Sequence, residues 1–154
     1  MTRKQKIEYL ESYREADQRV RALEWQIEKH QEQIVRCRES MMNPSLAIDG
    51  MPHGSPDDPM AKYAIRIEKL ERKVLDDIAL RQKRIVQCQA LQSEIEANLN
   101  RMSNRRYSDL LWLYYIDNCT WAQVAERLDC AERHVYRIYE RAIQQFDRKV
   151  RTCH

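Results

Sequence analysis

The chain of 154 residues is long enough for one domain, or for one small domain with an extension. Hydrophobic residues make up 43% and charged residues 33%, with only 2 Gly and 4 Pro, which excludes a disordered chain and favours long helices. The net charge of +3 arises in residues 101–154, which hold 10 basic and 7 acidic side chains, because residues 1–100 hold 17 of each. We predict an all-α protein with a mild basic bias in its last third.

No apolar run approaches the ~18 residues of a membrane span, since the longest, Leu110 to Ile116, has seven residues. The N-terminal MTRKQKIEYLES lacks the apolar core of a signal peptide. The five cysteines form no C-x-x-C pair and predict reduced, mostly buried thiols rather than a disulfide framework. A metal site at Cys153 and His154 is the alternative, which we do not favour. We expect a soluble, intracellular protein with no membrane partner and no bound metal.

Residues 3–42 carry mainly apolar side chains at alternating steps of four and three, the spacing of a coiled-coil seam. The spacing predicts a helix over most of this range. The one polar member, His30, is interpreted as a core or partly exposed histidine rather than a ligand. The members are Tyr9, Tyr13, Ala16, Val20, Leu23, Ile27, His30, Ile34, Cys37 and Met41.

Every Gly and Pro lies in residues 43–59, NPSLAIDGMPHGSPDDP, which predicts a loop between two helices. The spacing then resumes, with two consecutive steps of four at Leu70, Val74 and Ile78 that indicate a stutter. Two polar members are interpreted as setting the register or facing solvent. The members are Met60, Tyr63, Ile67, Leu70, Val74, Ile78, Arg81, Ile85, Cys88, Gln92, Ile95, Leu99 and Met102.

The two seams predict a long antiparallel hairpin over residues 1–102, with helices of ~60 Å at 1.5 Å per residue. A two-helix hairpin buries little by itself, so we expect its outer faces to meet a second copy, giving a homo-oligomer, or another protein. The chain has no glycine-rich phosphate loop and no H-E-x-x-H motif, and its four histidines are scattered. We therefore expect a protein that is not an enzyme and needs no cofactor.

The heptad spacing stops near residue 103, and the composition of the chain changes there. Residues 103–154 hold Trp112, Trp121 and the sole phenylalanine, Phe146, which can form a compact aromatic core. Both tryptophans are interpreted as packing residues rather than as stacking platforms for nucleic acid. The sequence predicts a small separate domain over residues 103–154.

Three helices fit this domain. The first covers about residues 104–116, the second is two turns long with Thr120 as its N-cap, and the third begins at about Ala131. Between the last two, Asp129 sits where the backbone must adopt a left-handed conformation, which Asp tolerates better than most residues. This arrangement predicts a helix-turn-helix. The side chains expected to face inward are Val124, Ala125, Leu128, Val135, Ile138, Ala142 and Phe146.

Residues 104–147 resemble region 4 of bacterial sigma factors, a DNA-binding helix-turn-helix. The matching residues are Thr120, Val124-Ala125, Leu128, Asp129-Cys130, Val135, Ile138 and Arg141-Ala142-Ile143. More closely, LLWLYYIDNCTWAQVAERLDCAERHVYRIYERAI is similar to phage-encoded transcriptional regulators of the RinA/ArpU-like group. Two residues depart from the sigma pattern: Asp129 replaces the usual Gly, and Ala131 replaces the usual Ser or Thr cap, so Asp129 is the alternative cap of the third helix.

The resemblance implies double-stranded DNA as the partner, with the third helix in the major groove. We expect base contacts from Glu132, Arg133, Tyr136 and Arg137, because Arg takes guanine in a bidentate contact and Glu accepts from cytosine. Tyr136 also fits a phosphate contact. The predicted phosphate contacts are Arg105, Arg106, Thr120, Arg141, Arg148 and Lys149. The alternative is that the outward charges only solvate the helix, as i,i+4 pairs.

The sequence thus predicts a regulator of phage or prophage genes that binds promoter DNA and acts by recruitment, with RNA polymerase as a further partner of the coil. Such a protein would work at the nucleoid, in the cytoplasm of the bacterial host. One alternative is a structural coiled-coil assembly protein whose C-terminal domain only contacts proteins. The other is a phage DNA-packaging recognition subunit, although those usually place the DNA-binding part first.

Overall fold

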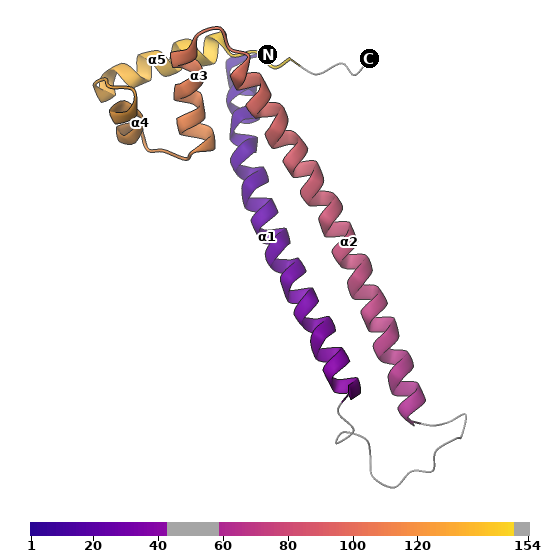
Figure 1. Cartoon of the computed structure of the whole chain (residues 1–154). Coiled ribbons are helices and arrows are strands. Elements are labelled where there is room, and N and C mark those ends of the chain that lie inside the picture. The colour runs from indigo at the N-terminus through magenta and orange to yellow at the C-terminus, as the bar shows by residue number, and fades with distance from the viewer. Residues whose placement is uncertain (43–58, 150–154) are drawn as a thin grey trace. The chain divides into compact units, whose positions relative to one another are not determined.

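The computed structural model describes residues 1–42 and 59–149. Every regular element within these ranges is helical, which confirms the all-α prediction. The elements are α1 (Arg3–Met42), α2 (Pro59–Asn100), α3 (Arg105–Leu111), a π-helical segment (Trp112–Ile116), α4 (Trp121–Arg127) and α5 (Glu132–Gln145), shown in Figure 1. The predicted loop over residues 43–59 lies outside the described residues, except for Pro59, which begins α2 as proline's fixed φ favours.

The chain divides into two compact units. We call Met1–Val20 with Val86–His154 the terminal unit, and Arg21–Ile85 the central unit. Both α1 and α2 contribute residues to each unit, and within each unit they run antiparallel (Figure 1). The two long helices therefore confirm the predicted antiparallel hairpin.

The central unit is held by a narrow apolar seam between α1 and α2. Ile34, Val74 and Ile78 are buried and pack together, with Ile27 partly buried against them. Two hydrogen bonds fix the register of the pair: Arg38 donates to Glu71 at 2.6 Å, and Arg81 donates to Gln26 at 3.1 Å. Residue numbers fall along α2 as they rise along α1, as in an antiparallel pair. These buried positions are members of the predicted seams.

Three predicted seam members of α2 are exposed instead: Met60 by 47%, Tyr63 by 42% and Leu70 by 38%. Because Arg38 lies opposite Glu71, the last residue of α1 lies opposite about residue 67, and the first turns of α2 extend past the end of α1. Leu70 is exposed for another reason. A step of three residues rotates it by roughly 60° away from the line of Ile67, given 3.6 residues per turn.

The terminal unit has a larger core, which joins the ends of α1 and α2 to the three short helices. Leu10 of α1 and Ile95 and Leu99 of α2 are fully buried in the same cluster as the C-terminal helices. Figure 1 shows α3, α4 and α5 gathered beside these ends. The fully buried side chains on the C-terminal side include Leu110, Leu111, Val124, Val135, Ile143 and Phe146. The core thus contains residues from both sides of residue 102.

The prediction of mostly buried thiols is wrong. Of the described cysteines only Cys119 is buried, whereas Cys37, Cys88 and Cys130 are half-buried. A pair of helices leaves the edges of its seam open to solvent, which explains Cys37 and Cys88. Cys153 lies outside the described residues. Within those residues no group of three or more His, Cys, Asp and Glu could hold a metal ion, and no helix is long and apolar enough to cross a membrane.

Candidate nucleic-acid interface

The start of α4 is fixed by a capping box. The backbone amide of Gln123 donates to Thr120 Oγ1 at 3.3 Å, and the amide of Thr120 donates to Gln123 Oε1 at 2.9 Å. This confirms Thr120 as the N-cap, and places Trp121 as the first residue of α4. The hydroxyl of Thr120 accepts in the cap, so its own hydrogen remains available to donate to a phosphate.

The turn between α4 and α5 is left-handed, as the sequence predicts. Asp129 has a φ of 50°, and the amide of Cys130 donates to the carbonyl of Ala125 at 3.0 Å. α5 begins at Glu132, because Ala131 is still extended, and no side chain caps the helix. The alternative cap by Asp129 is therefore not formed. A second left-handed residue, Asn118 with a φ of 55°, was not foreseen.

The inner face of the helix-turn-helix matches the predicted pattern. Val124, Val135, Ala142 and Phe146 have no exposed surface, and Ala125 is also buried. Leu128 and Ile138 are half-buried and pack against the same cluster, as do Trp112 and Trp121. The two tryptophans thus serve as packing residues.

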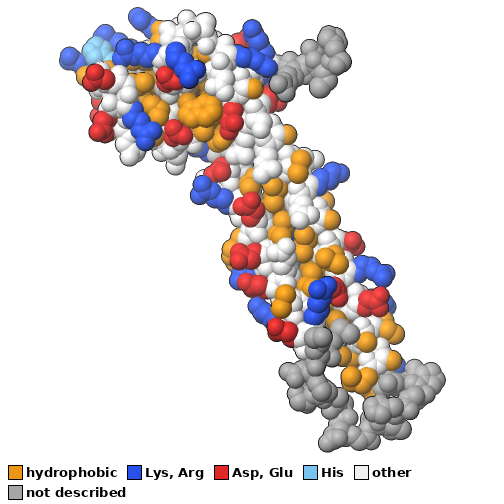
Figure 2. All heavy atoms as spheres, in the orientation of Figure 1, with side chains coloured by type: hydrophobic (Ala, Val, Ile, Leu, Met, Phe, Trp, Pro, Cys, Tyr) orange, Lys and Arg blue, Asp and Glu red, His pale blue; other side chains and the backbone are white. Residues whose placement is uncertain are grey.

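The outer face of α5 is exposed at all four predicted base-contact positions, Glu132, Arg133, Tyr136 and Arg137. Arg133, Arg137 and Arg141 follow each other at steps of four, so they form one row about 12 Å long. Within the described part of the chain these three arginines form no hydrogen bond and no ion pair. Figure 2 shows Lys and Arg side chains gathered on the surface over α5. Internal pairing along α5, the alternative above, does not occur among these residues.

The start of α1 lies against the second half of α5, which the sequence did not indicate. Arg3 makes a two-point contact with Glu140, with its Nη2 2.6 Å and its Nε 3.1 Å from the two carboxylate oxygens. Lys6 Nζ donates to the carbonyl of Gln144 at 2.9 Å, where a cation favours the C-terminal end of a helix. The hydrogen bond from Arg3 lowers the pKa of the Glu140 carboxyl. The Glu140 carboxylate is thus already paired with Arg3 within the protein.

The predicted phosphate contacts are placed in different ways. Arg141 and Lys149 are exposed, and Arg105 is exposed although it lies 3.4 Å from Asp109. Arg106 Nη2 donates weakly to the carbonyl of Leu128 at 3.4 Å. Arg148 is engaged more firmly, because its Nε donates to Glu94 at 2.8 Å. Hence Arg148 would have to leave an ion pair to reach a phosphate.

Arg148 also belongs to a polar network at the end of α2. Its guanidinium lies 4.7 Å over the ring of Tyr9, whose hydroxyl donates to Glu94 at 2.8 Å. The buried Asn98 donates to the same hydroxyl at 3.1 Å and accepts from the amide of Lys149 at 3.2 Å. The network fastens the segment after α5 to α1 and α2. It also lowers the pKa of Glu94, chiefly through the hydrogen bond from Arg148.

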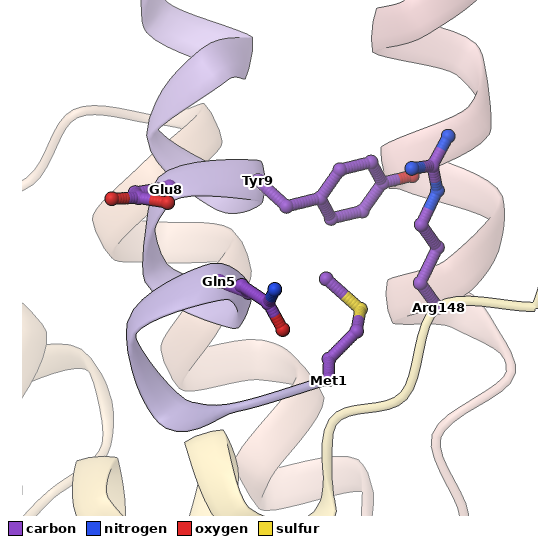
Figure 3. Close-up of a pocket in the computed structure, with 5 residues that line it drawn as sticks. All are labelled: Met1, Gln5, Glu8, Tyr9 and Arg148. Carbon is purple, nitrogen blue, oxygen red and sulfur yellow. The ribbon is translucent and has the colours of Figure 1, made fainter.

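A shallow pocket of about 330 Å³ opens beside this network, lined by Met1, Gln5, Glu8, Tyr9 and Arg148 (Figure 3). Figure 3 shows the Arg148 side chain reaching across the end of the Tyr9 ring, while the carboxylate of Glu8 points away from both.

The protein should lose stability at high pH, because the folded chain raises the pKa values of the Tyr9 and Tyr13 hydroxyls. Burial, and then the hydrogen bond to Glu94, raises the pKa of Tyr9 to about 12; burial and Glu96 do the same for Tyr13. Between pH 10 and about 12 the unfolded chain has lost these protons and the folded chain keeps them, so the free energy of unfolding falls as pH rises. Tyr9→Phe should make this fall shallower by about 1.4 kcal/mol per pH unit.

Urea denaturation at several pH values from 9 to 12 measures this slope. Tyr63→Phe is measured beside Tyr9→Phe, because it removes a hydroxyl from a tyrosine that is 42% exposed. Equal slopes for Tyr9→Phe and the unmodified chain would show that the Tyr9 phenol ionises alike in both states.

Comparisons with known proteins identify a family but no named relative. Neither the curated proteins nor the solved structures contain a match to this chain. One family model, described as "Protein of unknown function (DUF1492)", matches residues 50–147, a range that includes α2 to α5. Because the match covers more than half of the chain, the protein belongs to this family.

Proposed function

We propose that the protein is a sequence-specific, double-stranded DNA-binding regulator of phage or prophage transcription, which acts by promoter binding and recruitment. The observation that carries the proposal is the row of exposed arginines on α5, Arg133, Arg137 and Arg141, which are unpaired within the described residues, on a helix whose other side packs in the core. A rigid helix with cations on one face suits the major groove of DNA. The resemblance of residues 104–147 to sigma region 4 supports the same function.

The roles on α5 follow from its geometry. Arg133 and Arg137 lie in the first two turns, where a recognition helix reaches base edges, and each can take a guanine through two hydrogen bonds. Glu132 can accept from cytosine, and Tyr136 adds an exposed aromatic ring between the two arginines. Arg141, further along the row, suits a phosphate contact, as do the exposed Arg105, Arg106, Thr120 and Lys149 of the same unit.

Selection from random duplexes tests this function. The purified protein should enrich one motif at low and at moderate salt, and Arg133→Ala/Arg137→Ala should lose it, because each bidentate contact supplies about 1–3 kcal/mol of discrimination. Lys83→Ala/Arg84→Ala removes the same charge from exposed sites on α2 and should keep the motif. Absence of enrichment at either salt, with all three proteins alike, would leave α5 as a protein-contact surface.

We further propose that the central unit binds a second copy of the chain. Eight of the eleven large apolar side chains exposed among the described residues lie in Arg21–Ile85, including Trp25, Leu75 and Leu80. Figure 2 shows apolar side chains on the surface in this part of the chain. Such density of exposed apolar surface is typical of an interaction site. RNA polymerase is the other partner that recruitment would require.

Charge complementarity supports a second copy as the occupant. Arg66, Lys69 and Lys73 lie at steps of three and four, so they share one exposed face of α2. Glu24 and Glu28 share an exposed face of α1, and within the described residues none of these five side chains is paired. The basic face of one copy can therefore meet the acidic face of another.

Sedimentation velocity over a range of protein and salt concentrations measures this association. Lys69→Glu/Lys73→Glu should shift the protein toward monomer, and added salt should weaken the association of the unmodified chain. Lys4→Glu/Arg105→Glu changes the charge equally in the terminal unit and should sediment as the unmodified protein does. A protein that stays monomeric at every concentration would overturn the second copy and favour a different partner.

A further inference from the structure

Arg14 of α1 contacts the C-terminal part of the chain through its guanidinium group. Its guanidinium carbon lies 4.7 Å from the ring centre of Tyr114 and 5.7 Å from that of Tyr115. Its Nη2 donates to the carbonyl of Tyr114, whereas its buried Nε has no hydrogen-bond partner among residues 1–42 and 59–149. A guanidinium in this position loses bound water. The cation–π contacts with the two rings and the hydrogen bond to the carbonyl offset that loss.

The carbonyl that Arg14 reaches lies in the π-helical segment, close to where the helix ends. There the amide of Asp117 donates to the carbonyl of Trp112, the chain turns at the left-handed Asn118, and the amide of Cys119 donates to the carbonyl of Leu113. Helix ends leave carbonyls without backbone donors, and a cation is favourable beside them. Arg14 therefore closes the C-terminal end of this helix from outside it.

The Tyr114 ring continues the contact toward α4 and α5. It stacks on Trp121 with 4.0 Å between ring centres and 15° between planes. Trp121 in turn lies 5.3 Å from Tyr136 and 5.1 Å from Tyr139 of α5, and the Tyr139 hydroxyl is 2.8 Å from that of Tyr115. A continuous series of ring contacts thus runs from Arg14 to Tyr136, whose side chain is exposed between Arg133 and Arg137.

We propose that Arg14 is a positioning residue for the DNA-reading face of α5. It fixes the Tyr114 ring from one side, that ring fixes Trp121 at the start of α4, and Trp121 fixes Tyr136 and the angle at which α5 is presented. The inference rests on the proposed DNA binding. Arg14 is itself half-buried and does not belong to the exposed arginine row, so its role is separable from the phosphate contacts.

Three variants separate positioning from charge. Arg14→Lys keeps the cation without the planar group, Arg14→Gln keeps a donor for the Tyr114 carbonyl without the cation, and Arg14→Ala removes both. Arg19→Ala is the matched control, because Arg19 is an exposed arginine of the same helix. Each is compared below its own melting temperature, and the milder variants serve if Arg14→Ala does not fold.

Two readouts decide the proposal. The first is the ratio of the affinities for the selected site and for a scrambled duplex. This ratio should fall about tenfold in Arg14→Ala and recover partly in Arg14→Lys. The dependence of affinity on salt concentration, the salt slope, should not change. The second is acrylamide quenching of tryptophan emission in a Trp25→Phe background, which should increase as Trp121 is released. Arg19→Ala should match the unmodified protein in both.

The two readouts also distinguish failure of this inference from failure of the proposed function. An unchanged affinity ratio and unchanged quenching in folded Arg14→Ala would overturn the positioning role. A lower salt slope with the ratio preserved would overturn it too, by making Arg14 a phosphate contact. If the unmodified protein binds both duplexes equally, the proposed function fails, and the proposal for Arg14 fails with it. The quenching measurement would still show whether Arg14 holds the stacked rings of Tyr114 and Trp121 in place.

Discussion

Leu10→Ala is expected to lower the free energy of unfolding of the terminal unit by about 2–5 kcal/mol, the range for truncating a buried leucine. Leu10 has no exposed surface and packs in one cluster with Leu99 and Phe146. Truncation leaves a cavity where helices from both ends of the chain meet, so the neighbours cannot close it without moving a whole helix. Urea denaturation followed by tryptophan fluorescence measures the change.

Val86→Ala is the control for this prediction. Val86 is also an apolar residue of a long helix, but it is 62% exposed in the terminal unit, so its truncation should change the free energy of unfolding by less than about 0.5 kcal/mol. Similar losses in both variants would mean that Leu10 is not a core residue of the terminal unit.

The isolated segment 103–154 is expected to show no cooperative unfolding transition, although its helix-turn-helix pattern is complete. It lacks Leu10, Ile95 and Leu99, each fully buried against its helices. Three losses of about 2–5 kcal/mol each are together comparable to the roughly 5–15 kcal/mol by which a whole domain is usually stable. Circular dichroism during urea titration should show a gradual loss of helix, without a baseline at low urea.

A chain in which a short glycine-rich turn replaces residues 21–85 provides the positive control. Val20 and Val86 end the two pieces of the terminal unit, where α1 and α2 run side by side and antiparallel, so a turn can join them. This chain should unfold cooperatively. If segment 103–154 unfolds cooperatively by itself, the helices at residues 1–20 and 86–102 are dispensable for its fold.

Local signals in the sequence predicted much of the fold. The heptad spacing placed α1 and α2, because apolar side chains must meet the other helix about once per turn. Thr120 capped α4 and Asp129 adopted the left-handed turn, since both outcomes depend on atoms within three or four residues. The exposed positions of Arg133 and Arg137 followed from the same short-range periodicity.

Contacts between distant parts of the chain could not be predicted in this way. Leu10 lies off the seam of α1, and no spacing rule shows that it packs with buried residues 85 or more positions later, such as Ile95 and Phe146. The pairing of Arg3 with Glu140 likewise joins residues 137 positions apart. Each depends on where whole helices pack, which periodicity along one helix does not encode.

The candidate site shows the same division. Its exposed row on α5 was predictable, but the engagement of Arg148 by Glu94 was not, because the segment after α5 turns back to α2. The π-helical segment also had no sequence signal, and it places the Tyr114 carbonyl where Arg14 reaches it. The sequence shows that a residue is basic. Its neighbours in the folded protein determine whether that charge is free to bind a phosphate.

The terminal unit's use of both ends of the chain also sets the order of events during synthesis. Its core cannot close until Phe146 has left the ribosome, which is roughly 7–27 s after Leu10 at ~5–20 residues per second. The central unit is complete well before then. Throughout that interval the apolar side chains near the start of α1 lack their packing partners. A chaperone that binds nascent apolar segments can therefore bind this part of the chain for the longest time.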